Sequence, residues 1–264
     1  MKATTARIDI PRKIFQKAPR VADGERIYAI GDIHGRADLL VQMMRAISRD
    51  KKDAPPEQRS LSTKIIILGD FIDRGPQSRQ LIEALQHFEQ AHGLIVLLGN
   101  HEDALLACLD RRVDPRDGWL DFGGRETLES FGISVGLTDN SIKSALEELE
   151  RALGRDTIEW LRALPLYSIS GDFLFVHAGI RPGLDLRRQS PQDLLWIRDD
   201  FLSSQRSHPF FVVHGHSISS NVDLCSNRIG IDTGAWKTGR LTALRLFSDS
   251  LAAITVDDET SEAA

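Results

Sequence analysis

The chain has 264 residues, a formal net charge of -5 and a hydrophobic fraction of 41%, which together fit one sizeable domain. The mild negative charge gives no support to non-specific nucleic-acid binding, which depends on clustered Lys and Arg. Two cysteines without CxxC spacing, no secretory signal and no apolar stretch of ~18 to 20 residues lead us to expect a reducing, cytoplasmic setting and no membrane span.

The two ends of the chain differ in composition from the middle. The first twenty residues are rich in Lys and Arg and contain one acid, Asp9, whereas the chain ends in DDETSEAA. We expect residues 1–24 to form a basic arm that lies on the domain, residues 25–256 to form the domain itself, and residues 257–264 to form an acidic tail.

In the first hundred residues, short apolar runs alternate with segments of helical spacing. The runs 27–30, 65–68 and 94–98 are rich in Ile, Val and Leu and end at glycine, which is typical of strands buried on both faces. Between them, segments 37–47 and 77–90 repeat apolar residues at helical intervals. This alternation predicts an α/β sheet.

Beyond the first hundred residues the pattern changes twice. Residues 103–165 contain no convincing strand, but 142–153 and 157–164 are predicted helices, and Pro165 ends the second. The remainder is rich in strands, interrupted by one predicted helix over 191–202. These strands are predicted at 173–176, 210–213, 228–231, 241–247 and 251–256. No repeat or linker indicates a second domain.

Acids, amides and histidines directly follow the apolar runs. Residues just beyond the carboxyl ends of parallel strands converge on one crevice, so we expect these side chains to meet there. A mixed carboxylate, amide and imidazole set favours manganese, iron or zinc over calcium. More ligands than one ion needs predict two ions sharing a carboxylate, with Asp70 the central candidate. The residues are Asp32, His34, Asp70, Asn100, His101, His177, His214 and His216.

The spacing does not choose between His214 and His216. The two histidines are two residues apart, so in an extended continuation of the strand at 210–213 both would project from the same face. From the residues alone, either histidine fits a metal ligand.

The same residues lie in blocks that resemble the motifs of PPP-type phosphoprotein phosphatases, in the bacterial and phage-like branch of the calcineurin-like metallophosphoesterases. The resemblance implies a single α/β domain in which two mixed β-sheets pack as a sandwich flanked by helices, and makes 25–256 the catalytic domain. The blocks are GDIHG at 31–35, GDFIDRG at 69–75, GNHE at 99–102, HAG at 177–179, GHS at 215–217 in place of GHT, and IDTGA at 231–235.

The resemblance assigns ligands to two divalent ions. Manganese is the expected metal, and iron and zinc are the alternatives. The resemblance implies His216 rather than His214, because His216 follows the glycine of the GHS block. The implied ligands of the first ion are Asp32, His34 and Asp70, and those of the second are Asp70, Asn100, His177 and His216.

The resemblance also implies catalytic and substrate-binding residues. His101 resembles the general acid that protonates the leaving group, and Asp73 its orienting carboxylate. Arg74, Asn100 and Arg198 are the implied phosphate-binding residues. Each arginine also has a structural alternative. Arg74 could instead form an ion pair with Asp73, and Arg198 could form one with the acid at position 199 or 200.

The implied activity is phosphomonoester hydrolysis by a water that two metal ions activate. We expect a serine/threonine protein phosphatase, acting on phosphoserine or phosphothreonine, and on phosphotyrosine as a further substrate, in a phosphoprotein or phosphopeptide partner. The alternative is hydrolysis of a bis(5'-nucleosyl) tetraphosphate, because related enzymes carry near-identical metal blocks. Outside the enzymes, a phosphopeptide-binding module without turnover is possible, but the intact set of ligands argues against it.

Overall fold

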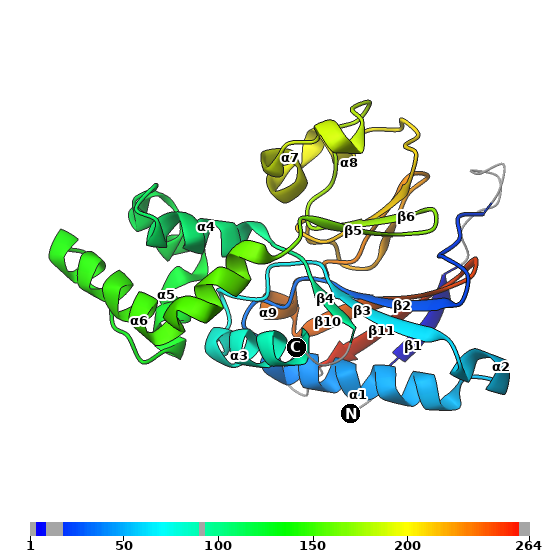
Figure 1. Ribbon diagram of the computed structural model, residues 1–264, viewed down its shortest axis with the longest axis horizontal. Coiled ribbons are helices and arrows are strands. Elements are labelled where there is room, and N and C mark those ends of the chain that lie inside the picture. The colour runs from blue at the N-terminus through cyan, green and yellow to red at the C-terminus, as the bar shows by residue number, and fades with distance from the viewer. Residues whose placement is uncertain (1–3, 9–17, 90–92, 259–264) are drawn as a thin grey trace.

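The computed structural model describes residues 4–8, 18–89 and 93–258, and their strands pair into two mixed sheets (Figure 1). The predicted fold class, a single α/β domain with two mixed sheets flanked by helices, is confirmed. The larger sheet has six strands and the smaller has five.

The six-stranded sheet has the order β1-β11-β10-β2-β3-β4. Its parallel half is formed by β2, β3 and β4, and β10 joins this half by pairing antiparallel with β2. The bounds are β1 (Thr4–Ile8), β2 (Glu25–Ile30), β3 (Ser62–Ile67), β4 (Leu94–Val96), β10 (Arg240–Phe247) and β11 (Ser250–Asp257).

The five-stranded sheet has the order β5-β6-β7-β9-β8. Its central strands β6, β7 and β9 run parallel, while the edge strands β5 and β8 run antiparallel to their neighbours. The bounds are β5 (Tyr167–Ser170), β6 (Phe173–Val176), β7 (Phe211–His214), β8 (Asp223–Leu224) and β9 (Arg228–Gly230).

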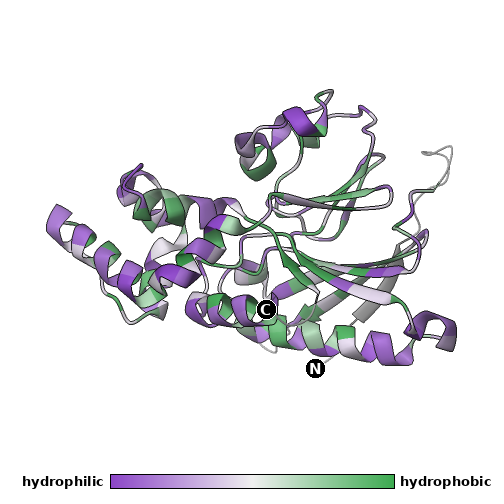
Figure 2. Cartoon of the chain, viewed as in Figure 1, coloured by the Kyte–Doolittle hydropathy of each residue, from purple (hydrophilic) through white to green (hydrophobic). Residues whose placement is uncertain are grey.

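Three apolar clusters hold the layers together. Alternate residues of β2 enter different clusters: Ile27 packs between the two sheets, whereas Tyr28 packs on the side of the helices. This two-sided burial explains why the strand reads as a continuous apolar run. A third cluster packs Leu194 and Phe201 against the outer face of the smaller sheet. Figure 2 shows the resulting apolar strands between helices that carry polar outer faces.

The helices cover the outer faces of the sandwich. In Figure 1, α1 and α3 lie along the larger sheet and α7 and α8 lie beside the smaller sheet. The Ser190 side chain caps α7 by accepting from the Asp193 N–H at 3.1 Å. The bounds are α1 (Ala37–Asp53), α2 (Pro56–Arg59), α3 (Ser78–Glu89), α4 (Asn100–Leu109), α5 (Arg125–Ser130), α6 (Asp139–Ala163), α7 (Pro191–Trp196), α8 (Asp199–Leu202) and α9 (Ala235–Thr238).

Short helical turns complete the architecture, and one predicted helix is divided in two. Three-residue turns lie at Pro115–Asp117 and Leu186–Arg188, and a wider turn spans Leu120–Gly124. The predicted helix over 191–202 is divided at Arg198, whose φ of -130° and ψ of -103° are not helical. The two helices predicted at 142–153 and 157–164 are separated by the non-helical Gly154 within α6.

Parts of both predicted terminal segments belong to the larger sheet. Residues 4–8, within the expected arm, form β1 and pair with β11, and Asp257, at the start of the expected tail, ends β11. Asp258 follows and forms an ion pair with Arg36 at 2.9 Å. Residues 1–3, 9–17 and 259–264 of these segments lie outside the described residues. Among the described helices, none is long and apolar enough to cross a membrane.

Candidate metal centre

The polar residues that follow the parallel strands meet at one edge of the sandwich. Three of them, His34, Asp70 and His216, have positive φ angles of 46°, 48° and 61°, which non-glycine residues adopt rarely. The loops pack closely here: a Cβ added at Gly99 would lie 2.2 Å from the Asp70 nitrogen. Such strained, tightly packed loops are typical of functional sites.

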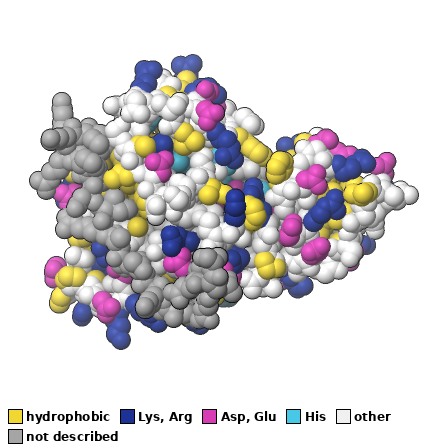
Figure 3. Space-filling model, turned by 180° about the vertical axis from the view of Figure 1, so that it is seen from behind, with side chains coloured by type: hydrophobic (Ala, Val, Ile, Leu, Met, Phe, Trp, Pro, Cys, Tyr) yellow, Lys and Arg dark blue, Asp and Glu magenta, His cyan; other side chains and the backbone are white. Residues whose placement is uncertain are grey.

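Two groups of possible ligands share the Asp70 carboxylate. The first consists of His34, Asp70 and His101, and the second of Asp70, His177 and His216. Within each group the ligand atoms all lie within 4.8 Å of one another, and every member is buried. In Figure 3 the histidines appear only as small patches between other side chains, in keeping with this burial.

Backbone carbonyls fix the orientation of two of these imidazoles. His34 Nδ1 donates to the Ile72 carbonyl and His177 Nδ1 donates to the Leu68 carbonyl, each at 2.9 Å. The opposite nitrogens face Asp70: Nε2 of His34 lies 3.6 Å from Oδ2 and Nε2 of His177 lies 3.4 Å from Oδ1. A histidine that donates from one nitrogen presents a lone pair on the other, as metal ligation requires.

Asn100 adds a further oxygen to the second group. Its Oδ1 lies 2.9 Å from His177 Nε2, the nitrogen that carries the lone pair. An amide oxygen, a carboxylate oxygen of Asp70 and an imidazole lone pair therefore face one another. Because three acceptors repel unless a positive charge lies between them, the residues present fit a divalent cation.

The electrostatics of the centre favour the same conclusion. Burial, together with the charges of Asp232 and Asp70, raises the pKa of Asp32 well above its usual range. Burial lowers the pKa of His34 to about 3 and that of His216 to about 2, so these imidazoles are neutral at physiological pH. Neutral imidazoles beside crowded carboxylates are what divalent ions stabilise.

Asp32 lies outside the two groups of three but contacts the same loops. Both of its carboxylate oxygens accept from the His216 backbone N–H, at 3.0 and 3.1 Å. The close approach of this loop depends on Gly215, where an added Cβ would lie 2.0 Å from Asp32 Oδ1. The structure therefore brings Asp32 to the same edge as the sequence predicted.

Buried side-chain atoms without a hydrogen-bond partner concentrate around this centre. Within the described parts of the chain they include His216 Nε2, Arg74 Nε, the Ser217 hydroxyl and Trp236 Nε1. The Arg74 guanidinium lies over the Trp236 ring, 4.9 Å from its centroid. Unpaired buried polar atoms are costly, so their clustering indicates where a polar ligand binds.

A histidine and a carboxylate form a close pair beside the metal ligands. His101 Nδ1 donates to Asp73 Oδ2 at 2.7 Å. Burial lowers the pKa of His101, but the charges of Asp70 and Asp73 outweigh burial and raise this pKa to about 9. A histidine that a buried carboxylate holds in one orientation has the chemistry of a general acid.

Two residues that sequence reasoning did not assign hold the Asp73 carboxylate. Trp119 Nε1 donates to Asp73 Oδ2 at 3.0 Å, and the Thr127 hydroxyl donates to Oδ1 at 2.6 Å. Neither residue lies in one of the sequence blocks that carry the resemblance. Both reach Asp73 from a segment without a recognised motif, so only the fold reveals them.

The two predicted phosphate-binding arginines contact different residues of the centre. Arg74 Nη2 lies 3.3 Å from His101 Nε2, and the Asp73 oxygens are already taken by other donors, which disfavours an Arg74–Asp73 pair. Arg198 Nη1 donates to the His216 carbonyl at 3.4 Å. The acid at position 200 instead pairs with Arg181, at 3.1 Å.

His214 faces away from the two ligand groups. Its Nε2 lies 3.3 Å from Arg228 Nη1, and its ring packs edge-on against Phe201 with centroids 5.2 Å apart. The assumption that an extended strand would carry both histidines on one face is wrong, because β7 ends at His214 and His216 has a positive φ. The turn rotates His216 toward Asp70.

Glu102 belongs to the GNHE block, but no role was assigned to it from the sequence. It is buried in the first turn of α4, and its two oxygens accept backbone N–H groups from Gly99, Asp70, Phe71 and Ile72 at 2.9 to 3.1 Å. Glu102 thereby ties the loop after β3 to the loop after β4. Its place in the GNHE block was the available signal.

Polar loops at the strand ends of two packed mixed sheets, with two ligand groups sharing one carboxylate, are characteristic of a metallophosphoesterase. The chain belongs to the calcineurin-like phosphoesterase family, whose model matches residues 25–245. The predicted superfamily is therefore confirmed.

Alignments with curated relatives cover more than half of this chain. A bis(5'-nucleosyl)-tetraphosphatase PrpE (asymmetrical) of Anoxybacillus flavithermus is 26% identical over 236 residues, 82% of this chain and 88% of the relative. A symmetrical bis(5'-nucleosyl)-tetraphosphatase of Methylococcus capsulatus is 32% identical over 158 residues, 59% of this chain and 44% of that protein.

Solved structures share the fold. The structure named "Crystal structure of a putative diadenosine tetraphosphatase" superposes with a TM-score of 0.60 at 19% identity, covering 92% of this chain and 99% of that chain. A cold-active protein-tyrosine phosphatase of Shewanella has a TM-score of 0.52 at 16% identity, covering 93% and 89%. At these identities the likeness concerns the fold alone.

The expected activity toward proteins is corrected by these comparisons. The prediction of a serine/threonine protein phosphatase with a phosphoprotein partner is wrong, because the curated relatives are named bis(5'-nucleosyl)-tetraphosphatases. The physical reason is that a metal site of this kind acts on a phosphoryl group, which both kinds of substrate contain, so its motifs do not distinguish the two substrates. The alternative stated beside that prediction fits better.

Proposed function

We propose that this protein hydrolyses dinucleoside tetraphosphates with the help of two divalent metal ions. The observation that carries the proposal is the pair of ligand groups sharing Asp70, found in a chain whose relatives over 82% of its length are named tetraphosphatases. A tetraphosphate bridge carries several negative charges, so a centre with two cations and two arginines suits it.

The proposed ligands are those that the sequence resemblance implied. When bound, the two ions neutralise phosphate charge and activate the attacking water. Manganese is the proposed metal, because the donors mix carboxylate, amide and imidazole. The first set is Asp32, His34 and Asp70, and the second is Asp70, Asn100, His177 and His216.

His101 is the proposed general acid and Asp73 its orienting partner. As water adds to phosphorus and gives up one proton to solvent, the bond from phosphorus to the bridging oxygen breaks, and His101 transfers its proton to that departing oxygen. His101 then regains a proton from solvent. The hydrogen bond of 2.7 Å to Asp73 holds the ring in one orientation. Trp119 and Thr127 are proposed positioning residues, because they fix the Asp73 carboxylate from both oxygens.

Arg74, Asn100 and Arg198 are the proposed phosphate-binding residues. Arg74 has a buried Nε without a partner and lies beside His101, where the reacting phosphoryl group would lie. Arg198 lies beside the His216 backbone, so it would contact a neighbouring phosphate. Planar guanidinium groups bind phosphate oxygens in pairs.

The test is hydrolysis of diadenosine tetraphosphate by the purified protein with manganese. We expect nucleotide products, and their identity, two diphosphates or one mono- and one triphosphate, defines which bond is cleaved. A parallel panel of phosphoserine, phosphothreonine and phosphotyrosine peptides should react far more slowly. Absence of nucleotide products from protein that carries metal and hydrolyses nitrophenyl phosphate would overturn the proposal.

A further inference from the structure

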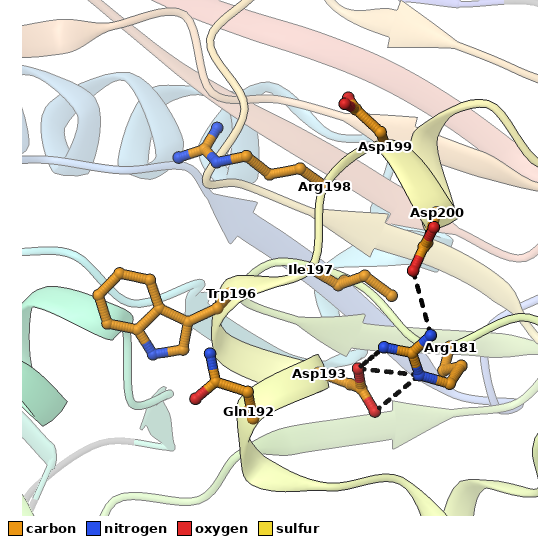
Figure 4. A pocket seen from close by; sticks show the side chains of 8 residues that line it. All are labelled: Arg181, Gln192, Asp193, Trp196, Ile197, Arg198, Asp199 and Asp200. Carbon is orange, nitrogen blue, oxygen red and sulfur yellow. Dashed lines mark hydrogen bonds and ion pairs between the residues drawn. The ribbon is translucent and has the colours of Figure 1, made fainter.

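A pocket of about 280 Å³ lies beside the metal centre, between α7, α8 and Arg181 (Figure 4). Its lining includes Gln192, Trp196, Arg198 and Asp199. No residue of this pocket is among the proposed metal ligands or the acid pair. Ligand pockets usually measure ~300 to 1,000 Å³, so this pocket suits a small part of a larger ligand.

Trp196 is a partly exposed aromatic side chain that lines this pocket. It remains 38% exposed although it ends α7, whose Leu194 and Leu195 are buried. Its ring lies edge-on to the His216 ring, with centroids 6.5 Å apart. The indole is therefore open to a ligand and lies next to a proposed metal ligand.

Arg198 connects this pocket with the metal centre. It lines the pocket and also donates to the His216 carbonyl at 3.4 Å. Figure 4 shows its guanidinium and the Trp196 indole extending in the same direction from the chain. A ligand whose phosphate binds Arg198 would therefore place its next group near the indole.

The opposite wall of the pocket is polar but locally neutralised. Arg181 pairs with Asp193 at 2.6 Å and with Asp200 at 3.1 Å, as the dashed lines of Figure 4 show. Outside this network, Figure 4 shows Gln192 beside Trp196 and Asp199 on the far side of Arg198. An amide and a carboxylate suit the ring nitrogens and amino group of a purine, whereas the acids disfavour a further phosphate.

We propose that this pocket binds the purine base of a nucleotide whose phosphates lie at the metal centre, with the base stacked on Trp196. The inference rests on the proposed function, since it names the part of the nucleotide that the metal ligands do not contact. The volume admits one base, so the second nucleoside of a dinucleotide lies elsewhere. Stacking on an aromatic ring tolerates any base, while the polar wall favours one with an amino group.

The experiment compares two ligands that differ only in the nucleoside. Isothermal titration of the full chain in manganese buffer would measure binding of α,β-methylene-ADP and of methylenediphosphonate, neither of which is cleaved between its two phosphorus atoms. We expect the nucleotide analogue to bind roughly 10-fold more tightly than methylenediphosphonate, because stacking of a base on an aromatic side chain contributes an affinity gain of this order. Trp196→Ala should reduce this preference to about twofold or less, and Trp196→Phe should retain most of it, because a phenyl ring still stacks.

Phe88→Ala is the matched control, because Phe88 is an exposed aromatic residue, 51% accessible, on α3 and away from α7 in Figure 1. It should leave both affinities unchanged. An undiminished preference in Trp196→Ala, or equal affinities in the wild type, would overturn the inference. Neither result depends on tetraphosphate cleavage, so a failure of the proposed function remains a separate outcome.

Discussion

The centre of the site and its rim differ in how firmly their side chains are held. At the centre, His177 is fully buried and hydrogen-bonded to Leu68, and Asp73 accepts bonds from three side chains. At the rim, Trp196 and Arg198 are exposed, and Arg198 has one bond to a backbone carbonyl. Phosphoryl chemistry requires the rigid part, whereas substrate choice depends on the part open to solvent. Changes at the centre should therefore abolish turnover, and changes at the rim should alter affinity.

Asp70→Asn should have the largest effect, because Asp70 belongs to both ligand groups. Loss of its charge weakens the binding of both ions. We therefore expect turnover to fall by roughly 10³-fold or more and the metal content to decrease. Phosphate release and metal analysis by mass spectrometry would measure both. Asp121→Asn, which removes an exposed carboxylate, is the control. Retention of two ions and normal turnover in Asp70→Asn would refute the shared ligand.

His216→Ala should rank next, with His214→Ala as its paired variant. His216 belongs to a ligand group and its Nε2 has no partner, whereas His214 contacts Arg228 and Phe201. We expect His216→Ala to lose one ion per chain and nearly all activity, and His214→Ala to keep both ions with a lower melting temperature. Metal analysis of the two variants distinguishes them, and the reverse result would assign ligation to His214.

His101→Asn should slow turnover without removing metal. We expect a loss of roughly 10² to 10⁴ on an alkyl phosphate, whose departing oxygen needs a proton. On nitrophenyl phosphate the loss should be smaller, because nitrophenolate leaves unprotonated. Steady-state rates on the two esters, with metal content measured in parallel, test this. Equal losses on both esters would exclude His101 as the acid.

Trp119→Phe should produce the same pattern on a smaller scale. The change removes the N–H that donates to Asp73 and keeps an aromatic ring, so we expect a loss of roughly 10-fold on the alkyl phosphate. The loss on nitrophenyl phosphate should be slight, which separates positioning of the acid from general damage. Trp160→Phe is matched, because Trp160 Nε1 also donates to one carboxylate, that of Glu89. An identical loss of rate on both esters would show that Trp119 does not act by positioning the general acid.

Arg198→Ala should have the smallest effect on turnover and act mainly on affinity. Loss of a charged phosphate contact should raise KM for the tetraphosphate by roughly 10-fold while kcat changes little. Arg187→Ala, which removes another arginine near the smaller sheet, serves as the control. If the kinetics of Arg198→Ala were indistinguishable from those of the wild type, Arg198 would have no role in phosphate binding.

The sequence by itself determined the layers and the candidate ligands. Strands buried on both faces need uninterrupted apolar runs, so β2 and β3 were visible in the sequence, and the residues that follow them were visible as candidates. The physical reason is that parallel strands end at one edge, so contiguous motifs become neighbours in space.

Only the tertiary structure decided which residues support these ligands and which side His214 faces. Trp119 and Thr127 reach Asp73 from 46 and 54 residues away, a separation that no local pattern encodes. His216 turns away from His214 because its backbone has a positive φ, which the period of a strand cannot predict. The rim depends in the same way on packing: Trp196 lies beside His216 because α7 packs on the smaller sheet. Local spacing predicts contacts within an element, whereas contacts between elements arise only when the layers pack.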